Sequence, residues 1–351
     1  NSNLSKLLED PLIKDDKYSL KAIFNLISVI ANQHHRYLDF FDKIEQILLH
    51  LKENTLKYYS NAEIFDIFKS NKRILLFLIK EKFLNVNQTI ANLIQQEEFL
   101  ADKYHFYLFP EINTLINVGL KDEVQKKVHQ LSSQNFGLFE AKRSQGENDD
   151  EICELIRKDA IEPFVSYLNN TSTPVSSNIK QSIFETNDLL LHNNPALIEY
   201  AAFYGSIQIF NYLRSNGAKL TPSIWPYAIH GNNLELLDIL KQNQIKPVDQ
   251  TYKDSIAESI KCHHNEVTKF IQTNFIQNQN IDDFTRLCAA KYHNYALIPD
   301  NASNIYFFYS LCQNDNVQLV ESLLRSFEIK NKINTIIILF IFFPNKVQTL
   351  F

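Results

Sequence analysis

Glycine and proline are scarce in this chain, and methionine is absent. The 351 residues include six glycines and ten prolines, less than half of the usual combined share of about 12%. An all-β protein needs turn residues at short, regular intervals, so this composition argues against one. It also leaves few glycines for loops that bind phosphate groups. Because residue 1 is Asn and no Met follows, we expect a fragment, a processed chain or an incomplete gene prediction.

Motifs that carry known chemistry are missing as well. The sequence has no GxGxxG, Walker, HExxH, GxSxG or CxxC pattern, so we expect no enzyme activity, no cofactor and no metal. The four cysteines are far apart, which indicates reduced thiols and a cytoplasmic location rather than a disulfide framework. Cys262, His263 and His264, with Cys288 further on, are metal-ligand types. Adjacent side chains on a helix do not share a face, so we expect these residues to fill turns.

The chain has no basic region and no long apolar run. Its net charge is −5 and neither half is basic, so binding to nucleic acid is not expected. The longest apolar run, residues 336–343, has eight residues, short of the ~18 that span a bilayer. Three interpretations of this run are open: a buried helix or strand, a truncated or out-of-frame tail, or a shallow membrane contact.

Helical periodicity is the strongest positive signal in the first part of the chain. Apolar residues recur at helical spacing through residues 17–140, beginning with Leu20, Phe24 and Ile27. Ser60 offers an N-cap for a helix that follows it, and residues 74–79 have no polar side, which predicts burial. We therefore expect a helical N-terminal region over residues 1–140, which is either a separate cap or a set of degenerate repeats.

Composition divides the rest of the chain. Residues 141–150 contain no large apolar side chain, so we expect a linker there. An array of helix pairs is expected over residues 151–326, and residues 327–351 form an apolar tail. The polar stretch 169–178 is expected to be a long loop, either a binding finger or a tolerated insertion.

Five segments of the sequence indicate this array. Each has the same pattern, in which an apolar helix is followed by a short turn and a second apolar helix. The second helices are expected to begin at Ile161, Ile207, Leu234, Asn265 and Val317, and a weaker copy lies near Cys288. A single pair of about 30 residues cannot bury its apolar face alone, whereas stacked pairs share a continuous core.

The clearest of these segments resembles the ankyrin repeat. Ala201-Ala202, Gly205 and the pair Gly217-Ala218 match the family pattern, although its Thr-Pro-Leu-His start is replaced by residues 196–199. In later copies the glycine of the turn becomes Asn232, His263 and Asp315, which tolerate a helix-ending turn better than most residues. Residues 151–275 are similar to a divergent ankyrin family that is expanded in some protists and carries a domain of unknown function.

The resemblance implies an all-α solenoid of ankyrin-like helix pairs behind the N-terminal helices. It also implies a partner-binding surface on the inner side of the first helices and at the loop tips. The residues expected on that inner side are Tyr200, Phe203, Tyr204, Tyr227, His230, Glu258, Lys261, Lys291 and Tyr292. Trp225 aligns with a core position, and both a core role and a role as partner anchor are open.

The function that fits these observations is a non-catalytic adaptor or scaffold, binding a protein partner through the concave face and loop tips of the array. A structural family member without a fixed partner is one alternative, and a peripheral membrane protein attached through its apolar tail is another. We expect a monomer. The sequence does not identify the partner.

Overall fold

The chain is all-helical wherever its structure is described. The computed structural model describes residues 15–33, 40–96, 104, 106–115, 136–276, 282–298, 310, 311, 313, 314 and 316. These residues form 18 α-helices and one 3-10 helix, and their only β-type pairing is an isolated bridge between Asn178 and Ala196. The expected all-α class is confirmed. Asp315, the second helix expected at Val317 and the apolar run 336–343 lie outside the described residues.

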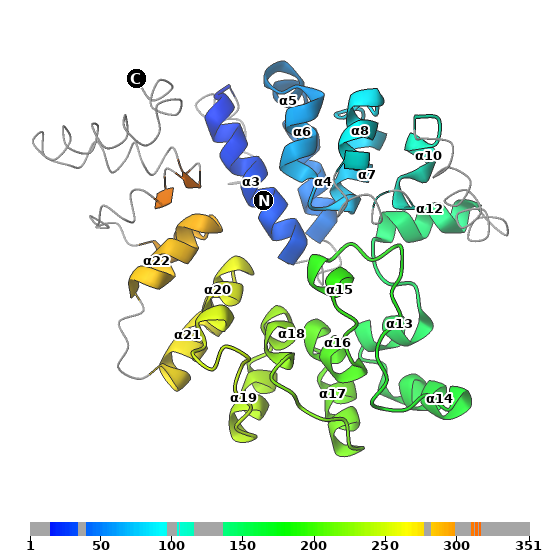
Figure 1. Cartoon of the computed structure of the whole chain (residues 1–351), viewed down its shortest axis with the longest axis vertical. Helices are drawn as coiled ribbons and strands as arrows, with labels where there is room; N and C mark the ends of the chain where they lie inside the picture. The colour runs from blue at the N-terminus through cyan, green and yellow to red at the C-terminus, as the bar shows by residue number, and fades with distance from the viewer. Residues whose placement is uncertain are drawn as a thin grey trace, which may run out of the picture. The chain divides into compact units, whose positions relative to one another are not determined.

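Short helices fill the first part of the chain (Figure 1). They are α3 (Lys17–Gln33), α4 (Phe40–His50), α5 (Lys52–Tyr58), α6 (Asn61–Phe68), α7 (Lys72–Lys80), α8 (Gln88–Gln96), α10 (Phe109–Ile112) and α12 (Phe136–Gln145). None of the described helices, here or later in the chain, is both long enough and apolar enough to cross a membrane.

Helices in pairs follow in the second part. They are α13 (Glu151–Arg157), α14 (Ile161–Thr171), α15 (Asp188–His192), α16 (Leu197–Tyr204), α17 (Ile207–Ser215), α18 (Ile224–His230), α19 (Leu234–Gln242), α20 (Lys253–Lys261), α21 (Asn265–Phe275), α22 (Asp282–Lys291) and η1 (Tyr295–Leu297). The four described starts of the predicted second helices agree with α14, α17, α19 and α21.

The chain forms two compact units. One unit comprises residues 27–271, and the other comprises residues 1–26 together with 272–351. Each contact described below lies within one of these units.

Local sequence explains how the N-terminal helices begin. At Ser60 the side chain accepts a hydrogen bond from the Glu63 N–H, and the Glu63 carboxylate accepts one from the Ser60 N–H. This is a capping box, which satisfies two backbone donors that the first helical turn leaves unpaired. The predicted N-cap is therefore confirmed. The apolar strip that follows is also mostly buried, with Ile74 and Leu75 fully so.

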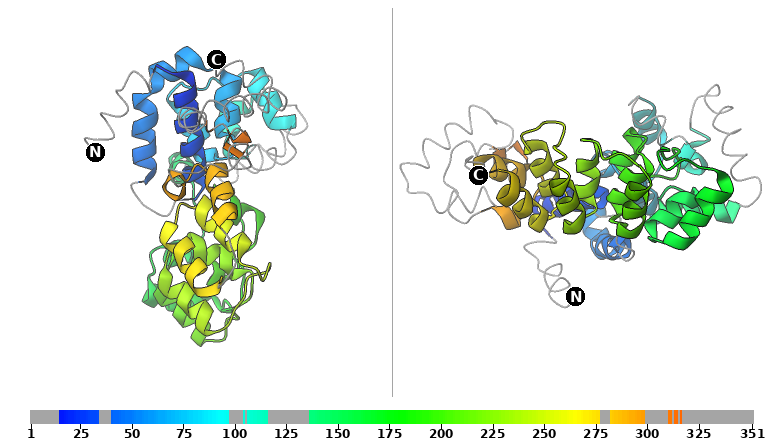
Figure 2. Two further views of the ribbon diagram at one scale, coloured as in Figure 1. Left: turned by 90° about the vertical axis from the view of Figure 1, so that its left-hand side faces the viewer. Right: turned by 90° about the horizontal axis from the view of Figure 1, so that it is seen from below.

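Helix pairs stack through their first helices. Helix α16 packs against α13 on one side and α18 on the other, and α18 packs against α20. The second helices form a further row, in which α14 contacts α17 (Figure 1). Seen from below, the pairs follow one another from green to yellow in chain order (Figure 2, right). Small side chains at the contact, Ala201 and Ala202, are completely buried.

A left-handed residue ends the first helix of each described pair. Positive φ angles occur at Asp159, Gly205, Asn232, His263 and His293. Gly205 is the residue that the family pattern places there, and Asn232 and His263 were expected to take its place. A left-handed residue ends a helix because its N–H reaches back to a carbonyl of the last turn. The same turn chemistry therefore recurs although only one of the five residues is glycine.

Hydrogen bonds from side chains join successive pairs. The Ser206 hydroxyl donates to the Ile156 carbonyl at 2.6 Å, and His264 Nδ1 donates to the Ile229 carbonyl at 2.9 Å. Asp159 accepts from the backbone N–H groups of Gln208 and Ile209 at the start of α17. Each of these bonds satisfies a backbone group at a helix end, where no partner within the same helix is available.

Gly231 marks the closest approach between two of these helices. A Cβ atom at this position would lie 2.1 Å from the Ala202 carbonyl oxygen. The Gly231 backbone is helical, with φ −58° and ψ −21°, and in that conformation a change from Gly to Ala ordinarily stabilises a protein by ~0.4–1 kcal/mol. A loss of stability in a Gly231→Ala variant would therefore indicate a steric clash. A gain would indicate that the backbone entropy effect dominates.

We expect Gly231→Ala to destabilise the chain by about 1–3 kcal/mol, because overpacking against backbone forces neighbouring helices to move. Urea unfolding followed by circular dichroism measures this. Gly217→Ala is the control, because the added Cβ meets no atom within 4 Å although φ is +95°. The Gly217→Ala variant measures the cost of placing a Cβ on a residue with positive φ, in the absence of any steric clash. A gain in stability for Gly231→Ala would contradict the close approach.

Three residues of the stretch 141–150, where composition predicts a linker, are buried: Arg143, Gly146 and Asn148. Helix α12 extends to Gln145, and the Arg143 side chain is completely buried. Asn148 is also buried, and its amide donates to the Lys180 carbonyl at 2.7 Å. Polar side chains that form hydrogen bonds and ion pairs fill positions that apolar residues occupy in other cores, which is why apolar content alone did not reveal the packing here.

Candidate functional site

The nine residues expected on an inner binding surface fall into three classes. Four are buried, namely Tyr200, Phe203, Tyr227 and His230. Tyr204, Glu258, Lys261 and Tyr292 are partly buried, and Lys291 is exposed. Four of the nine thus expose little surface in this conformation, although Tyr227 among them also lines the groove described below. The role of the nine in binding stays a prediction.

Aromatic packing explains the burial. The Tyr204 ring lies 4.9 Å from that of Tyr200 and 5.0 Å from that of Phe203, and Phe203 stacks on His230 at 5.1 Å. Arg157 Nη1 donates a hydrogen bond to the Tyr200 hydroxyl at 3.1 Å. These side chains form an internal layer along the first helices, and burial raises the pKa of both tyrosines well above the ordinary value.

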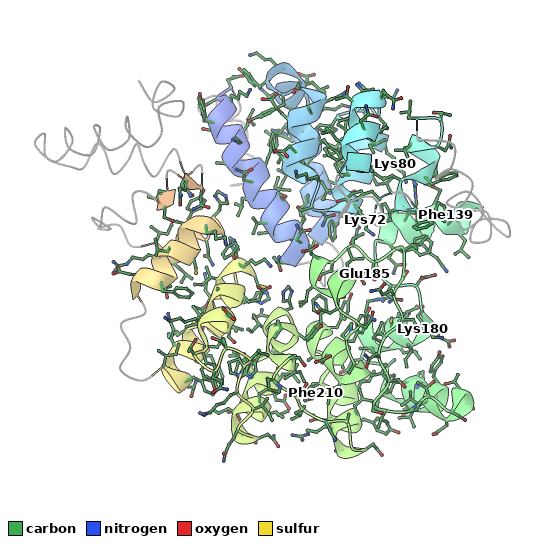
Figure 3. All side chains as sticks on the ribbon, viewed as in Figure 1. Lys72, Lys80, Phe139, Lys180, Glu185 and Phe210 are labelled. Atoms are coloured by element: carbon green, nitrogen blue, oxygen red, sulfur yellow. The ribbon has the colours of Figure 1, made fainter. Side chains whose placement is uncertain are left out.

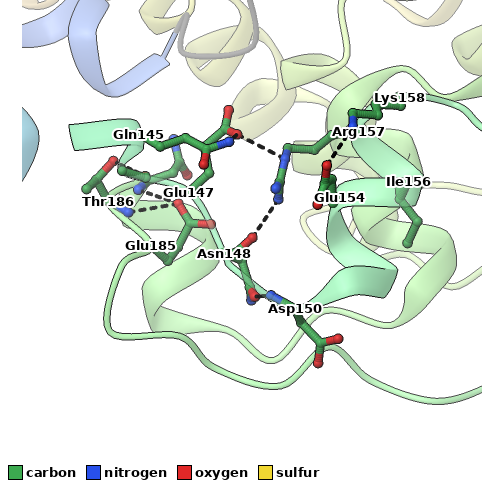
Figure 4. Close-up of polar contacts among 12 residues, drawn as sticks. Gln145, Glu147, Asn148, Asp150, Glu154, Ile156, Arg157, Lys158, Glu185 and Thr186 are labelled. Carbon is green, nitrogen blue, oxygen red and sulfur yellow. Dashed lines mark hydrogen bonds and ion pairs between the residues drawn. The ribbon is translucent and has the colours of Figure 1, made fainter. Parts of the chain in front are cut away.

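A polar network lies beside this layer, around the connection from α12 to α13 (Figure 4). Arg157 Nε pairs with Glu147 at 3.0 Å, and Arg157 Nη1 donates to the Asn148 carbonyl at 2.8 Å. Glu185 is buried nearby, and its Oε1 accepts the N–H groups of Thr186 and Asn187. Lys72 of α7 is adjacent to Glu185 in Figure 3 and lowers the pKa of its carboxyl group, although burial raises that pKa more.

A groove opens between the two loops that enter α18 and α20. It has a volume of about 310 Å³, and Pro222, Pro226, Tyr227, Pro247 and Val248 supply its apolar lining. Val248 is 73% exposed, the highest exposed fraction among the large apolar side chains of the described residues. Trp225 also contributes to the lining from a buried position, and its indole N–H donates to the Ile245 carbonyl at 2.9 Å. Trp225 thus packs as a core residue.

All charged residues that line this groove are acidic. They are Asp249, Asp254 and Glu258. Asp249 Oδ2 accepts hydrogen bonds from the Thr251 hydroxyl and the Asp254 N–H, whereas its Oδ1 is buried without a hydrogen-bond partner among the described residues. A buried acceptor without a donor costs about 1–3 kcal/mol. A ligand that brings a donor to this oxygen would remove that cost.

Three metal-ligand side chains meet at Glu258, which also lines the groove. Glu258 Oε1 lies 2.7 Å from His230 Nε2 and 3.4 Å from Lys261 Nζ. Cys262 Sγ completes the cluster, in which all three ligand atoms lie within 4.8 Å of one another. Burial raises the pKa of Glu258. The hydrogen bond and charge of His230, together with Lys261, lower that pKa by more than burial raises it, so that it falls to about 2. Glu258 is therefore a carboxylate at neutral pH.

The cysteines of the described residues are poor nucleophiles in this structure. Burial raises the pKa of Cys153 to about 12 and that of Cys288 to about 11, and it also raises that of Cys262 well above its ordinary value. A thiol reacts through its thiolate form, so none of the three is activated for catalysis without a bound cation.

Sequence reasoning missed both the groove and the cluster. The segment Pro247-Val248-Asp249 combines an exposed apolar residue with an acid at a loop tip, which is the one local signal for the groove. Glu258 and Cys262 are four residues apart, so they share a helix face. His230 comes from another helix, and no local spacing connects it to them.

Neither a family model nor a curated protein nor a solved structure matches this chain.

Proposed function

We propose that this chain is a non-catalytic protein-binding module and that the groove between the α18 and α20 loops binds an extended segment of a partner. The segment carries an apolar side chain beside a lysine or arginine. The observation that carries this proposal is that Asp249 lines a groove whose lining charges are all negative, while its buried Oδ1 is an acceptor without a donor among the described residues. A cationic donor would satisfy it and meet complementary charge.

The fold supports a binding role. We infer that the stacked pairs from α13 to α21 form a divergent ankyrin-like solenoid, in which loops at one edge are free to vary while the helices keep their packing. The contacts among α13, α16, α18 and α20 support this inference, as do the left-handed turns that end α16, α18 and α20. The groove lies between the connections that enter two successive first helices, and loops in such positions tolerate change and carry function.

A peptide-display library of extended segments, panned on the full chain, tests the proposal. We expect enrichment of lysine or arginine next to a large apolar residue. Binding of an enriched peptide, measured by fluorescence anisotropy, is expected to weaken about tenfold in Asp249→Asn/Asp254→Asn, which corresponds to about 1.4 kcal/mol. Both carboxylates accept charge-assisted hydrogen bonds in the proposed complex, and asparagine keeps their size.

The matched control is Glu162→Gln/Glu235→Gln, which removes two exposed carboxylates away from the groove. We expect this control to bind like the unmodified chain. Equal losses in the two double variants would show that net charge, not the groove, attracts the peptide. Enrichment without basic residues would contradict the proposed chemistry.

A further inference from the structure

The cluster of His230, Glu258 and Cys262 joins two neighbouring first helices. His230 is the last residue of α18, whereas Glu258 lies in the last turn of α20 and Cys262 follows that helix directly. Helices α18 and α20 pack against each other. Glu258 and Cys262 therefore face His230 from one side, and the three ligand atoms lie within 4.8 Å of one another.

These distances are close to those of a tetrahedral zinc site. Zinc binds nitrogen and oxygen at about 2.0–2.2 Å and sulfur at about 2.3 Å, so two ligand atoms on one ion lie about 3.3–3.7 Å apart. His230 Nε2 and Glu258 Oε1 are 2.7 Å apart, in a direct hydrogen bond. A movement of about 1 Å that separates this pair would make room for an ion at the centre of the cluster.

The side chains of this cluster are enclosed, and two of them have an atom with a weak partner or none. His230 is 2% exposed, and its Nδ1 is buried without a hydrogen-bond partner. Cys262 is completely buried, and its thiol has a long contact of 3.7 Å with Gln33 Oε1. The 2.7 Å contact between His230 Nε2 and Glu258 Oε1 holds one proton between the two atoms. A cation that binds both atoms displaces this proton, and the neutral His230 ring then carries its proton on Nδ1.

We propose that His230, Glu258 and Cys262 bind a Zn²⁺ ion. The donor set of one nitrogen, one oxygen and one sulfur suits zinc, whereas calcium and magnesium select oxygen ligands alone. The Cys262 thiol loses its proton to solvent as sulfur binds the metal, and the Nζ atom of the half-buried Lys261 releases the Glu258 carboxylate. The proposal needs no ligand in the groove, although Glu258 belongs both to the cluster and to the groove lining.

Cobalt substitution tests this site in the full chain. Co²⁺ bound to a thiolate gives a charge-transfer absorption in the near ultraviolet, and a tetrahedral ion adds intense bands in the visible range. We expect one equivalent of Co²⁺ to produce both, and one equivalent of Zn²⁺ to remove them. In Cys262→Ser the charge-transfer band is expected to disappear, whereas it is expected to remain in Cys153→Ser, a matched change at a buried cysteine outside the cluster.

A second measurement on the unmodified chain covers the case in which Cys262→Ser does not fold. Alkylation of each cysteine under mildly destabilising conditions is followed by peptide mass spectrometry, with and without Zn²⁺. We expect Zn²⁺ to slow the alkylation of Cys262 at least tenfold and to leave that of Cys153 unchanged. A cobalt spectrum without a thiolate band, or equal protection of both cysteines, would overturn the proposal.

Discussion

Replacing Arg143 with methionine is expected to destabilise the folded chain by about 3–5 kcal/mol, the cost of removing one partner from a buried ion pair. The Arg143 side chain is completely buried. Its two terminal nitrogens bond both carboxylate oxygens of Glu111, at 2.9 and 2.7 Å, and Nη1 also donates to the Tyr107 carbonyl at 2.7 Å. Without the guanidinium group, Glu111 and the carbonyl lose their donors. Denaturant unfolding gives the free energy directly.

A double-mutant cycle separates the energy of the ion pair from the cost of leaving one buried charge without its partner. Arg143→Met/Glu111→Gln removes the charges of Arg143 and Glu111 and leaves only Glu140, the second carboxylate paired with Arg143, so we expect it to be less destabilised than Arg143→Met alone. Arg143→Lys is expected to lose much of the stability as well, because an ammonium group cannot form the two parallel bonds that Glu111 accepts. A free-energy change below about 0.5 kcal/mol for Arg143→Met would be typical of an exposed residue and would contradict this network.

Glu185 should make the stability of the chain depend on pH near neutrality. Burial raises the pKa of its carboxyl group from 4.5 to about 7, and its Oε2 is buried without a partner. The folded chain then holds a proton that the unfolded chain has already released. Stability therefore falls as pH rises from about 4.5 to about 7, and the full change across this window is about 3 kcal/mol.

Unfolding curves at several pH values, compared with those of Glu185→Gln, measure this contribution. The amide does not titrate, so the difference in unfolding free energy between the two chains should vary across the window and become constant above it. Glu154→Gln is the control, since this glutamate is more than half exposed. Identical pH dependence in the unmodified chain and Glu185→Gln would show that Glu185 does not keep its proton near neutral pH.

Much of the helical framework followed from local sequence. The capping residue Ser60 and the turn residues Asn232 and His263 act within a few positions of themselves, so their chemistry is visible in short segments. The burial of Tyr200, Phe203 and His230 was not predicted, because a repeat pattern indicates which side of a helix a residue occupies but not what covers that side. In this chain, Arg157 from α13 bonds Tyr200 of α16, and no local pattern links the two.

The candidate site was less predictable for the same reason. Asp249 is identified as a candidate only once its buried Oδ1 is known to lack a donor. The burial of that oxygen depends on the path of a loop, which the local sequence does not specify. Likewise, His230 precedes Glu258 by a full helix pair, so their 2.7 Å contact is a product of stacking. Arg143 shows the converse error, since a charged residue in a polar stretch was expected to be solvated and is instead completely buried.

The hydrogen bonds between successive helix pairs limit how freely such a chain could be shortened or extended. Asp159 accepts from the first N–H groups of α17, and Ser206 donates back to the Ile156 carbonyl at the end of α13. Separating these two pairs would leave the Asp159 carboxylate without these donors and the first N–H groups of α17 without this acceptor. The pairs are therefore not interchangeable modules, and insertions or deletions are best tolerated in the loops, where no such exchange is interrupted.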